Sequence, residues 1–411
     1  MKYGDYKIEC SLQDVNKICN EEKKVKKITA KNPRRPYLPI AEWCNGGEAM
    51  LILDEAHNIA NPTSQQTQMM LLHAPLFKYR YLFSGTPADK FEKLYAQYQV
   101  LDPYLNYNLS YNAWKDKLAV LGDHFSAYAI KEWKRDELEK LNKRFTGSYG
   151  NYYNTSDVVE LPDHYEKRVY CAMNPKHREL YQAFVQEDLA NLKGFSTRDI
   201  VNRFPYQMLS LDCPKLLLNQ EKLSSRLYKA IEGFKDDYLS KLEYTDAILE
   251  EETAPTEKGI LWALHPATLD ILYKRYQKYN PILINADIEQ SERFALVDEF
   301  KKGDHRLLIA SISCLNTSVT ITECSFQVYL ERGFSYSTFE QSQRRIYRAG
   351  QDKTVTSYYL IYERSLDSLV DANLSSKGQI VEGAVSKDFL TKEQWQRIFN
   401  GSVNDTFEDL K

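Results

Sequence analysis

Short apolar runs and amphipathic stretches alternate along the first part of the chain. An apolar run covers residues 50–53, apolar residues with helical spacing follow through 69–72, and a second strand candidate, rich in aromatic residues, covers 79–83. Short apolar runs that flank a helical stretch are typical of buried parallel strands. This pattern predicts two strand–loop–helix units of an α/β fold, each with polar groups at the end of its strand.

The pattern changes between residues 88 and 160. Helical spacing covers residues 90–101 and 131–145, and aromatic residues recur throughout the region. Their spacing lacks the regularity of an exposed base-stacking surface, so we assign most of them to a core and keep base stacking as the alternative. We interpret the region as a helical insertion.

Strands and helices alternate again after an acidic stretch at residues 250–255. Strands are predicted at 259–264, 281–285, 306–311, 326–330 and 355–361, and helices at 267–279, 289–302 and 338–348. We also expect a strand at 165–171, helices at 175–192 and 242–252, and one tail helix near 389–399. Repeated alternation predicts a parallel sheet that helices cover on both faces.

The composition is that of an ordinary globular protein with two or three domains. The chain has 411 residues, of which 43% are hydrophobic and 27% charged, and its formal net charge is −3. A polyanion would therefore bind at a local basic patch, such as the segment that contains Arg34 and Arg35. The alternative for this segment is a solvated surface.

Cysteine spacing and hydropathy bear on where the protein resides. Seven cysteines occur without any CxxC pair, which argues against a zinc site and a disulfide framework and favours a reducing compartment. The sequence shows neither an apolar leader nor a run of 18 apolar residues, so we expect neither secretion nor membrane insertion. We expect the cytoplasm of a prokaryotic or infected cell, with a nuclear location as the alternative.

The apolar run at 50–53 stops at Asp54, Glu55, Ala56 and His57. In open α/β sheets, ligands bind at the carboxyl ends of the strands. Asp54 is therefore placed to hold Mg²⁺, directly or through water, and Glu55 to polarise an attacking water. The alternative is a strand that ends in a solvated acidic turn.

A second group of polar residues runs from Gln341 to Gln351 and contains Arg345 and Arg348. On the predicted helix these arginines are three residues apart and share a face. Two guanidinium groups on one face suit the spread charge of a phosphoryl-transfer transition state. The alternative is a basic helix exposed to solvent.

Several motifs in order make the stretch from about residue 48 to about residue 375 resemble the Swi/Snf-type motors of helicase superfamily II. These motors include double-stranded-DNA translocases, chromatin remodellers and their bacterial and phage relatives. The matching segments are Asp54–His57 with Asn61, Ser84–Pro87, Ser240–Leu242, Gly259–Trp262, Leu307–Thr322 and Gln341–Gln351. A single motif of this kind is weak evidence, whereas six in order are strong.

The resemblance implies an α/β fold with two RecA-like lobes, in which parallel sheets are flanked by helices. Residues 1–160 would form a partial first lobe and the start of the insertion, and 161–239 the rest of the insertion and a linker. Residues 240–376 would form the second lobe, and 377–411 a tail.

The resemblance also implies ATP and Mg²⁺ as cofactors and double-stranded DNA as a partner, held mainly by its backbone. Asp54, Glu55, Arg345 and Arg348 would be catalytic, with Asp54 and Glu55 at the metal. Nucleotide contacts would come from His57, Ser84, Gly85, Thr86, Gln341, Gly350 and Gln351. DNA contacts would come from Ser311, Thr317 and Ser318, besides the basic segment with Arg34 and Arg35.

One motif of these motors is missing from the chain. A P-loop, GxxxxGK[ST], cradles the phosphates with backbone amides and a lysine, yet the sequence contains no Gly-Lys pair, and only 53 residues precede Asp54. We therefore expect an incomplete first lobe and a second polypeptide that supplies the P-loop, giving a split motor. The alternatives are an inactive DNA-binding or regulatory remnant and a piece of a longer enzyme. Heavy use of Tyr and Lys suits a phage or virus.

Overall fold

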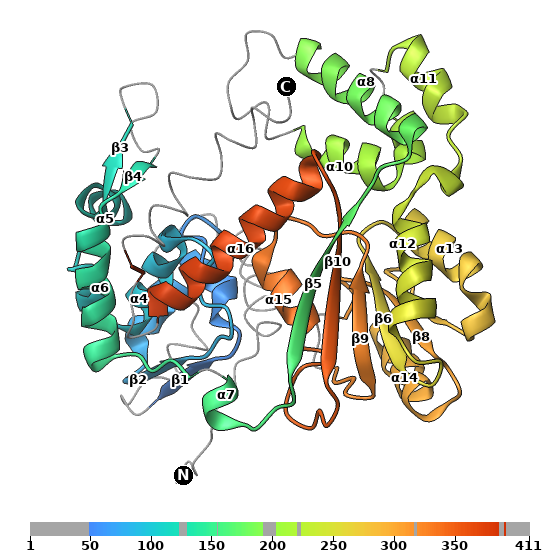
Figure 1. Ribbon diagram of the computed structural model, residues 1–411. Coiled ribbons are helices and arrows are strands. Elements are labelled where there is room, and N and C mark those ends of the chain that lie inside the picture. Colours follow the sequence, from blue (N-terminus) through green and yellow to red (C-terminus); the bar gives the residue numbers. More distant parts are fainter. Residues whose placement is uncertain are drawn as a thin grey trace, which may run out of the picture. The chain divides into compact units, whose positions relative to one another are not determined.

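The computed structural model describes residues 49–122, 130–153, 155–191, 203–219, 223–315, 319–385 and 390–391 (Figure 1). The chain forms two compact units. Unit 1 comprises Met1–Tyr153 and Ser376–Asn400, and unit 2 comprises Asn154–Ser375 and Gly401–Lys411. Within the described ranges, no helix is long and apolar enough to cross a membrane.

Two parallel strands, β1 (Met50–Leu53) and β2 (Tyr79–Leu82), form a sheet in unit 1. Helix α3 (Gln65–His73) connects them, which is the strand–helix–strand order that the sequence predicts. The leucines of β1 are buried in a small core together with Val100 of α4 (Leu94–Leu101). Parallel pairing puts the carboxyl ends of both strands at the same edge of the sheet.

The rest of unit 1 is a helical region with a short hairpin. Its elements after α4 are α5 (Tyr111–Leu118), β3 (Ala119–Leu121), β4 (Ile130–Trp133) and α6 (Arg135–Ser148). The helix predicted from residue 131 begins only at Arg135, because β4 pairs with β3 in an antiparallel hairpin. Trp114 and Trp133 are buried and pack edge to face, with ring centroids 6.2 Å apart. These two aromatic side chains lie in a core, as predicted.

Helix α16 (Leu366–Val385) is absent from the elements predicted above. Its first part contributes Leu366 and Leu374 to the core of unit 2, and its last part contributes Ile380 and Val385 to the helical core of unit 1. The chain therefore returns to unit 1 after it has completed the sheet of unit 2. The tail helix predicted near 389–399 lies almost entirely outside the described residues.

Six parallel strands form the sheet of unit 2 (Figure 1). In spatial order they are β5 (His164–Cys171), β10 (Val355–Tyr362), β9 (Cys324–Tyr329), β6 (Lys258–Ala263), β8 (Leu307–Ser311) and β7 (Ile282–Ile284). Every residue of β8 and β9 is buried, as parallel strands covered on both faces require. The edge strand β5 comes from the segment between residues 161 and 239.

Helices flank this sheet (Figure 1). They are α12 (Lys241–Ala247), α13 (Pro266–Arg275), α14 (Gln290–Lys302), α15 (Tyr336–Gln343) and the start of α16. Between β5 and α12 in the chain, α8 (Pro175–Asn191) packs against α10 (Phe204–Asp212) and α11 (Ser225–Glu232), and the short α7 (Thr155–Val158) precedes β5. The predicted α/β class, with parallel strands flanked by helices, is confirmed. The predicted boundaries of the domains stay a prediction.

Candidate functional site

The two polar turns of unit 1 lie side by side where β1 and β2 end. The amide of Phe83 donates to the carbonyl of Leu53 at 2.8 Å, and the amide of Ala56 donates to the carbonyl of Phe83 at 2.9 Å. These two bonds continue the parallel ladder beyond the strands. Residues 54–57 and 83–86 are therefore brought together by the register of the sheet.

A histidine joins the two turns through its side chain. Nδ1 of His57 lies 3.1 Å from Oγ of Ser84 and 3.2 Å from Oε2 of Glu55. The amide of Thr86 donates to the same Ser84 hydroxyl at 3.2 Å. Thr86 is buried and Gly85 is exposed. The acidic turn and the hydroxyl-rich turn thus form one connected set of polar groups.

Glu55 has an unusual backbone conformation. Its φ of 52° and ψ of 48° lie in the left-handed region, which costs a residue with a side chain about 1–2 kcal/mol. Oδ1 of Asp54 accepts a hydrogen bond from the Glu55 amide at 2.9 Å and helps to hold this turn. Both carboxylates are exposed. The strained turn presents two acids to solvent at the end of β1, where they could hold a divalent cation.

The two arginines of unit 2 do not lie on a common helix, and that expectation is wrong. Helix α15 ends at Gln343, so Arg345 and Arg348 lie in the turns that follow it. Arg345 is 8% exposed and donates from Nη1 to the carbonyl of Val319 at 3.3 Å. Arg348 is half-buried.

Gln351 holds the turns that follow the helix. Its Nε2 donates to the carbonyls of Cys324 and Ile346 at 2.9 and 3.0 Å, and its Oε1 accepts from the amides that follow it. These bonds tie the turn to the start of β9, and Gly350 supplies a positive φ of 97° that the turn needs. Gln351 is therefore occupied by backbone groups of its own unit. Gln341 lies half-buried within α15.

The remaining predicted site residues are only partly described. Ser311 is buried at the end of β8, and its hydroxyl lies 3.0 Å from that of Ser313. Thr317, Ser318, Arg34 and Arg35 lie outside the described residues. The acids of unit 1 and the arginines of unit 2 are each described within their own unit, so their meeting at one ATP site stays a prediction.

A buried ionisable cluster in unit 2 was not predicted from the sequence. Nζ of Lys241 lies 2.7 Å from Oδ2 of Asp367 and 3.3 Å from Oδ1 of Asp212, and it also donates to the carbonyl of Leu330 at 2.7 Å. Burial alone would lower the pKa of Lys241, but the two carboxylates outweigh it and raise that pKa. Burial raises the pKa of Asp212 to about 8 even though Lys241 opposes the shift.

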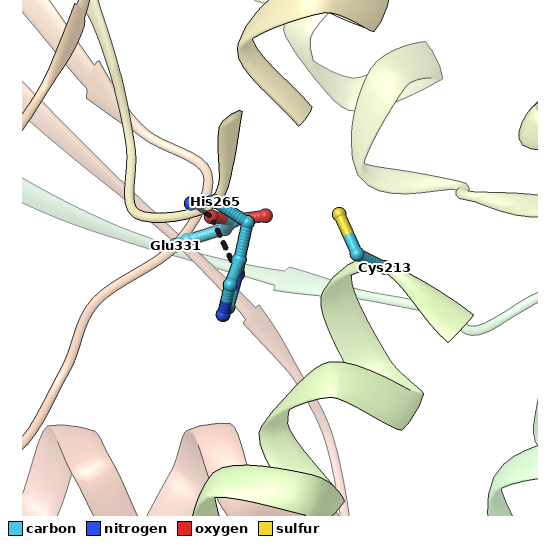
Figure 2. A group of neighbouring side chains, drawn as sticks. All are labelled: Cys213, His265 and Glu331. Carbon is cyan, nitrogen blue, oxygen red and sulfur yellow. Dashed lines mark hydrogen bonds and ion pairs between the residues drawn. The ribbon is translucent and has the colours of Figure 1, made fainter. Parts of the chain in front are cut away.

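Beside this cluster, Cys213, His265 and Glu331 come together (Figure 2). One ligand atom from each residue lies within 4.8 Å of the other two. Nδ1 of His265 is 3.1 Å from Oε2 of Glu331, and Sγ of Cys213 is 2.7 Å from Oγ1 of Thr268. The Thr268 hydroxyl also donates to Oε1 of Glu331. These residues are far apart in sequence, so no local spacing pattern predicts the group.

The charges of this group follow from its contacts. Burial would lower the pKa of His265, but the hydrogen bond and the charge of Glu331 outweigh burial and raise that pKa to about 9. Burial would raise the pKa of Glu331, yet the contacts with His265 lower it. Burial also raises the pKa of the Cys213 thiol. Without a metal, the group is an imidazolium–carboxylate pair beside a neutral thiol.

Comparison with known proteins identifies the family. The SNF2-related domain matches residues 20–215, and the helicase conserved C-terminal domain matches residues 240–350. Together these two models cover most of the chain in the order found in Swi/Snf-type motors. The chain therefore belongs to the Swi/Snf-type (SNF2) helicases of superfamily II.

Individual relatives are distant. The mouse DNA annealing helicase and endonuclease ZRANB3 is 25% identical over 381 residues, which cover 88% of this chain and 33% of the relative. The Bacillus subtilis putative ATP-dependent helicase/translocase YwqA is 20% identical over 368 residues, which cover 85% of this chain and 37% of the relative. The chain thus spans about a third of the length of these relatives. The Sulfolobus solfataricus SWI2/SNF2 ATPase core in complex with dsDNA is 21% identical, over 89% of this chain and 76% of that one, but its TM-score of 0.40 is too low to bear on the fold.

Proposed function

We propose that this chain is part of a DNA-dependent ATPase motor of the Swi/Snf type and that a separate polypeptide supplies its P-loop. One observation carries the proposal: Glu55, His57 and Ser84 form a connected polar group at the carboxyl ends of two parallel strands. In an α/β sheet this is the edge at which a nucleotide binds. Membership of the family supports ATP, Mg²⁺ and double-stranded DNA as the cofactors and substrate.

The acidic turn fits a magnesium nucleotide. Asp54 and Glu55 offer exposed carboxylate oxygens, which are the ligands that Mg²⁺ prefers. Bound Mg²⁺ would neutralise charge on the phosphates. Asp54 would hold the metal, and Glu55 would orient the attacking water, since His57 fixes its carboxylate from one side. Arg345 and Arg348 would then stabilise the transferred phosphoryl group.

The missing P-loop is the reason to propose a second polypeptide. A triphosphate beside two carboxylates needs amide and lysine donors to balance its charge, and the sequence has no Gly-Lys pair. Tyr79 and Tyr81 of strand β2 and Phe83 just after it are 44, 48 and 55% exposed. Among the described strands, β1 is the one partner of β2. An aromatic strand face of this kind supports the docking of a further segment.

DNA binding by this motor would be tolerant of sequence, because contacts to the backbone carry no base information. Thr317 and Ser318 would contact phosphates from unit 2, whereas the burial of Ser311 argues against the direct contact expected of it. Arg34 and Arg35 would add charge from the basic segment. Binding through such contacts weakens steeply as salt is raised.

ATP hydrolysis by the chain alone and by mixtures tests the proposal. The second component is the GxxxxGK[ST] polypeptide that the proposal requires, sought in the reading frame next to this chain, and double-stranded DNA is added or omitted. We expect hydrolysis only when both polypeptides and DNA are present. Glu55→Gln should abolish it, whereas Glu160→Gln, a change at an exposed acid outside the site, should leave it intact. Full activity of the Glu55→Gln mixture, or no activity in any mixture, would contradict the proposal.

A DNA-binding remnant without catalysis is the second candidate, and the missing Gly-Lys pair favours it. In that case the chain would bind DNA with a steep salt dependence and no ATPase activity with any partner. Glu55→Gln would then leave every measurable property of the chain unchanged.

A further inference from the structure

We propose that Cys213, His265 and Glu331 form a zinc-binding site in unit 2, separate from the nucleotide site (Figure 2). The site would be structural. It would tie the end of α10 to the turns that follow β6 and β9.

The fold itself brings two of the ligands together. Strands β6 and β9 are parallel neighbours, and each is followed after one intervening residue by a ligand, His265 after β6 and Glu331 after β9. The amide of Leu330 donates to the carbonyl of Trp262 at 3.0 Å, which continues the ladder to this point. The third ligand, Cys213, is the first residue after α10.

The donor set suits zinc. A thiolate sulfur, an imidazole nitrogen and a carboxylate oxygen all bind Zn²⁺ at about 2.0–2.3 Å, which places the ligands of a tetrahedral site roughly 3.5 Å apart. Nδ1 of His265 and Oε2 of Glu331 are already 3.1 Å apart, and Sγ of Cys213 completes a group within 4.8 Å. A small inward movement of the Cys213 side chain would close the site.

Charge balance permits the ion. Zn²⁺ with one thiolate and one carboxylate is neutral, as is the imidazolium–carboxylate pair beside a thiol. Binding therefore exchanges one Zn²⁺ for two protons, one from the Cys213 thiol and one from the His265 ring. The buried region gains no net charge, so the exchange avoids the penalty of burying an uncompensated ion.

The surroundings hold the carboxylate in place before any metal arrives. Oε2 of Glu331 accepts the amides of Leu264 and His265 at 2.6 and 2.9 Å. The hydroxyl of Thr268 contacts both Cys213 and Glu331, so it or a water could fill the fourth position. The His265 side chain is 22% exposed, so the ion can reach the site from solvent. Such orientation of ligands by neighbouring groups is typical of metal sites.

Metal titration of the full, untagged chain tests the site. After chelator treatment, Zn²⁺ should bind with one ion per chain at unit 2, and Co²⁺ should give the charge-transfer absorption of a thiolate ligand. With free zinc at about 100 times Kd, the melting temperature should rise by roughly 5 °C or more. Cys213→Ser and His265→Gln should each remove the thiolate band or the thermal shift. The matched controls Cys314→Ser and His305→Gln should keep both.

Three results would overturn the proposal. One is that the wild-type chain binds no zinc, which would leave a hydrogen-bonded cluster only. Another is that Cys213→Ser and His265→Gln bind zinc as well as the wild type does. If those variants fail to fold, X-ray absorption of the wild-type zinc complex decides, and a zinc shell without one sulfur and one imidazole nitrogen is the third such result.

Discussion

Nδ1 of His57 and Oγ of Ser84 lie 3.1 Å apart, although 27 residues separate them in sequence. The contact joins the acidic turn after β1 to the hydroxyl-rich turn after β2. It gives a direct physical route by which a change at one turn reaches the other.

Loss of the Ser84 hydroxyl should weaken DNA-stimulated hydrolysis in the reconstituted motor. Ser84→Ala removes the partner of His57 and the acceptor of the Thr86 amide. A hydrogen bond of this kind is worth about 1 kcal/mol, or roughly fivefold in rate. Steady-state ATPase assays with and without DNA measure the effect. Ser110→Ala is the control, because Ser110 is exposed and makes no side-chain cap bond. An unchanged rate for Ser84→Ala would show that the contact is not used.

Removal of the buried cation should destabilise unit 2 strongly. Lys241→Met leaves the carboxylates of Asp212 and Asp367 without their shared counter-charge, and breaking a buried pair in this way costs about 3–5 kcal/mol. Calorimetry should show a lower melting temperature for the transition of unit 2. Lys235→Met, at an exposed position, should melt like the wild type. Equal melting of the two variants would mean that the cluster is not buried in solution.

The stability of the metal-free chain should fall as pH rises toward about 9. The pKa of His265 is raised in the folded state to about 9 from an ordinary 6.5. Its pairing with Glu331 therefore stabilises the fold fully below pH 6.5, and this contribution is lost as pH rises through about 9. The difference is at most about 3 kcal/mol.

Melting curves in chelator between pH 6 and pH 10 measure this loss. Asp212 titrates in the same range, so the informative quantity is the difference between the wild type and His265→Gln. That difference should shrink as pH rises. A difference that stays constant across the range would exclude the ion pair.

Ile380 should matter for the stability of unit 1. It is 8% exposed and belongs to the helical core with Trp114, and truncation of a buried isoleucine to alanine costs about 2–5 kcal/mol. Hydrogen exchange of α5 should accelerate in Ile380→Ala. Exchange of the sheet in unit 2 should change much less. Glu382→Ala, at an exposed position of the same helix, should leave both unchanged.

Local patterns predicted local features well. The strands β1 and β2 and the turns after them follow from short apolar runs that stop at polar residues, and parallel pairing then puts Asp54, His57 and Ser84 at one edge. The end of α15 did not follow, and the turns after it depend on a long-range contact, in which the side chain of Gln351 bonds the carbonyl of the distant Cys324. Helical spacing alone continues to Arg348.

The sequence did not predict the features that depend on contacts between distant residues. Cys213, His265 and Glu331 follow three different helices and strands. The absence of CxxC pairs argued against zinc, but that argument applies only to ligands that are close in sequence. α16 was missed as well. Its first and last parts belong to different cores, and the sequence pattern alone does not show this division. Only the order of strands and the path of the chain bring these residues to their partners.

The return of the chain to unit 1 has a consequence for biosynthesis. Ile380, Val385 and Leu390 belong to the same core as Phe91, which was translated almost three hundred residues earlier. Domains commonly fold one after another as they leave the ribosome. Here the helical core of unit 1 stays unfinished until the sheet of unit 2 has emerged, so nascent chains should expose the aromatic side chains of that core to chaperones throughout the interval.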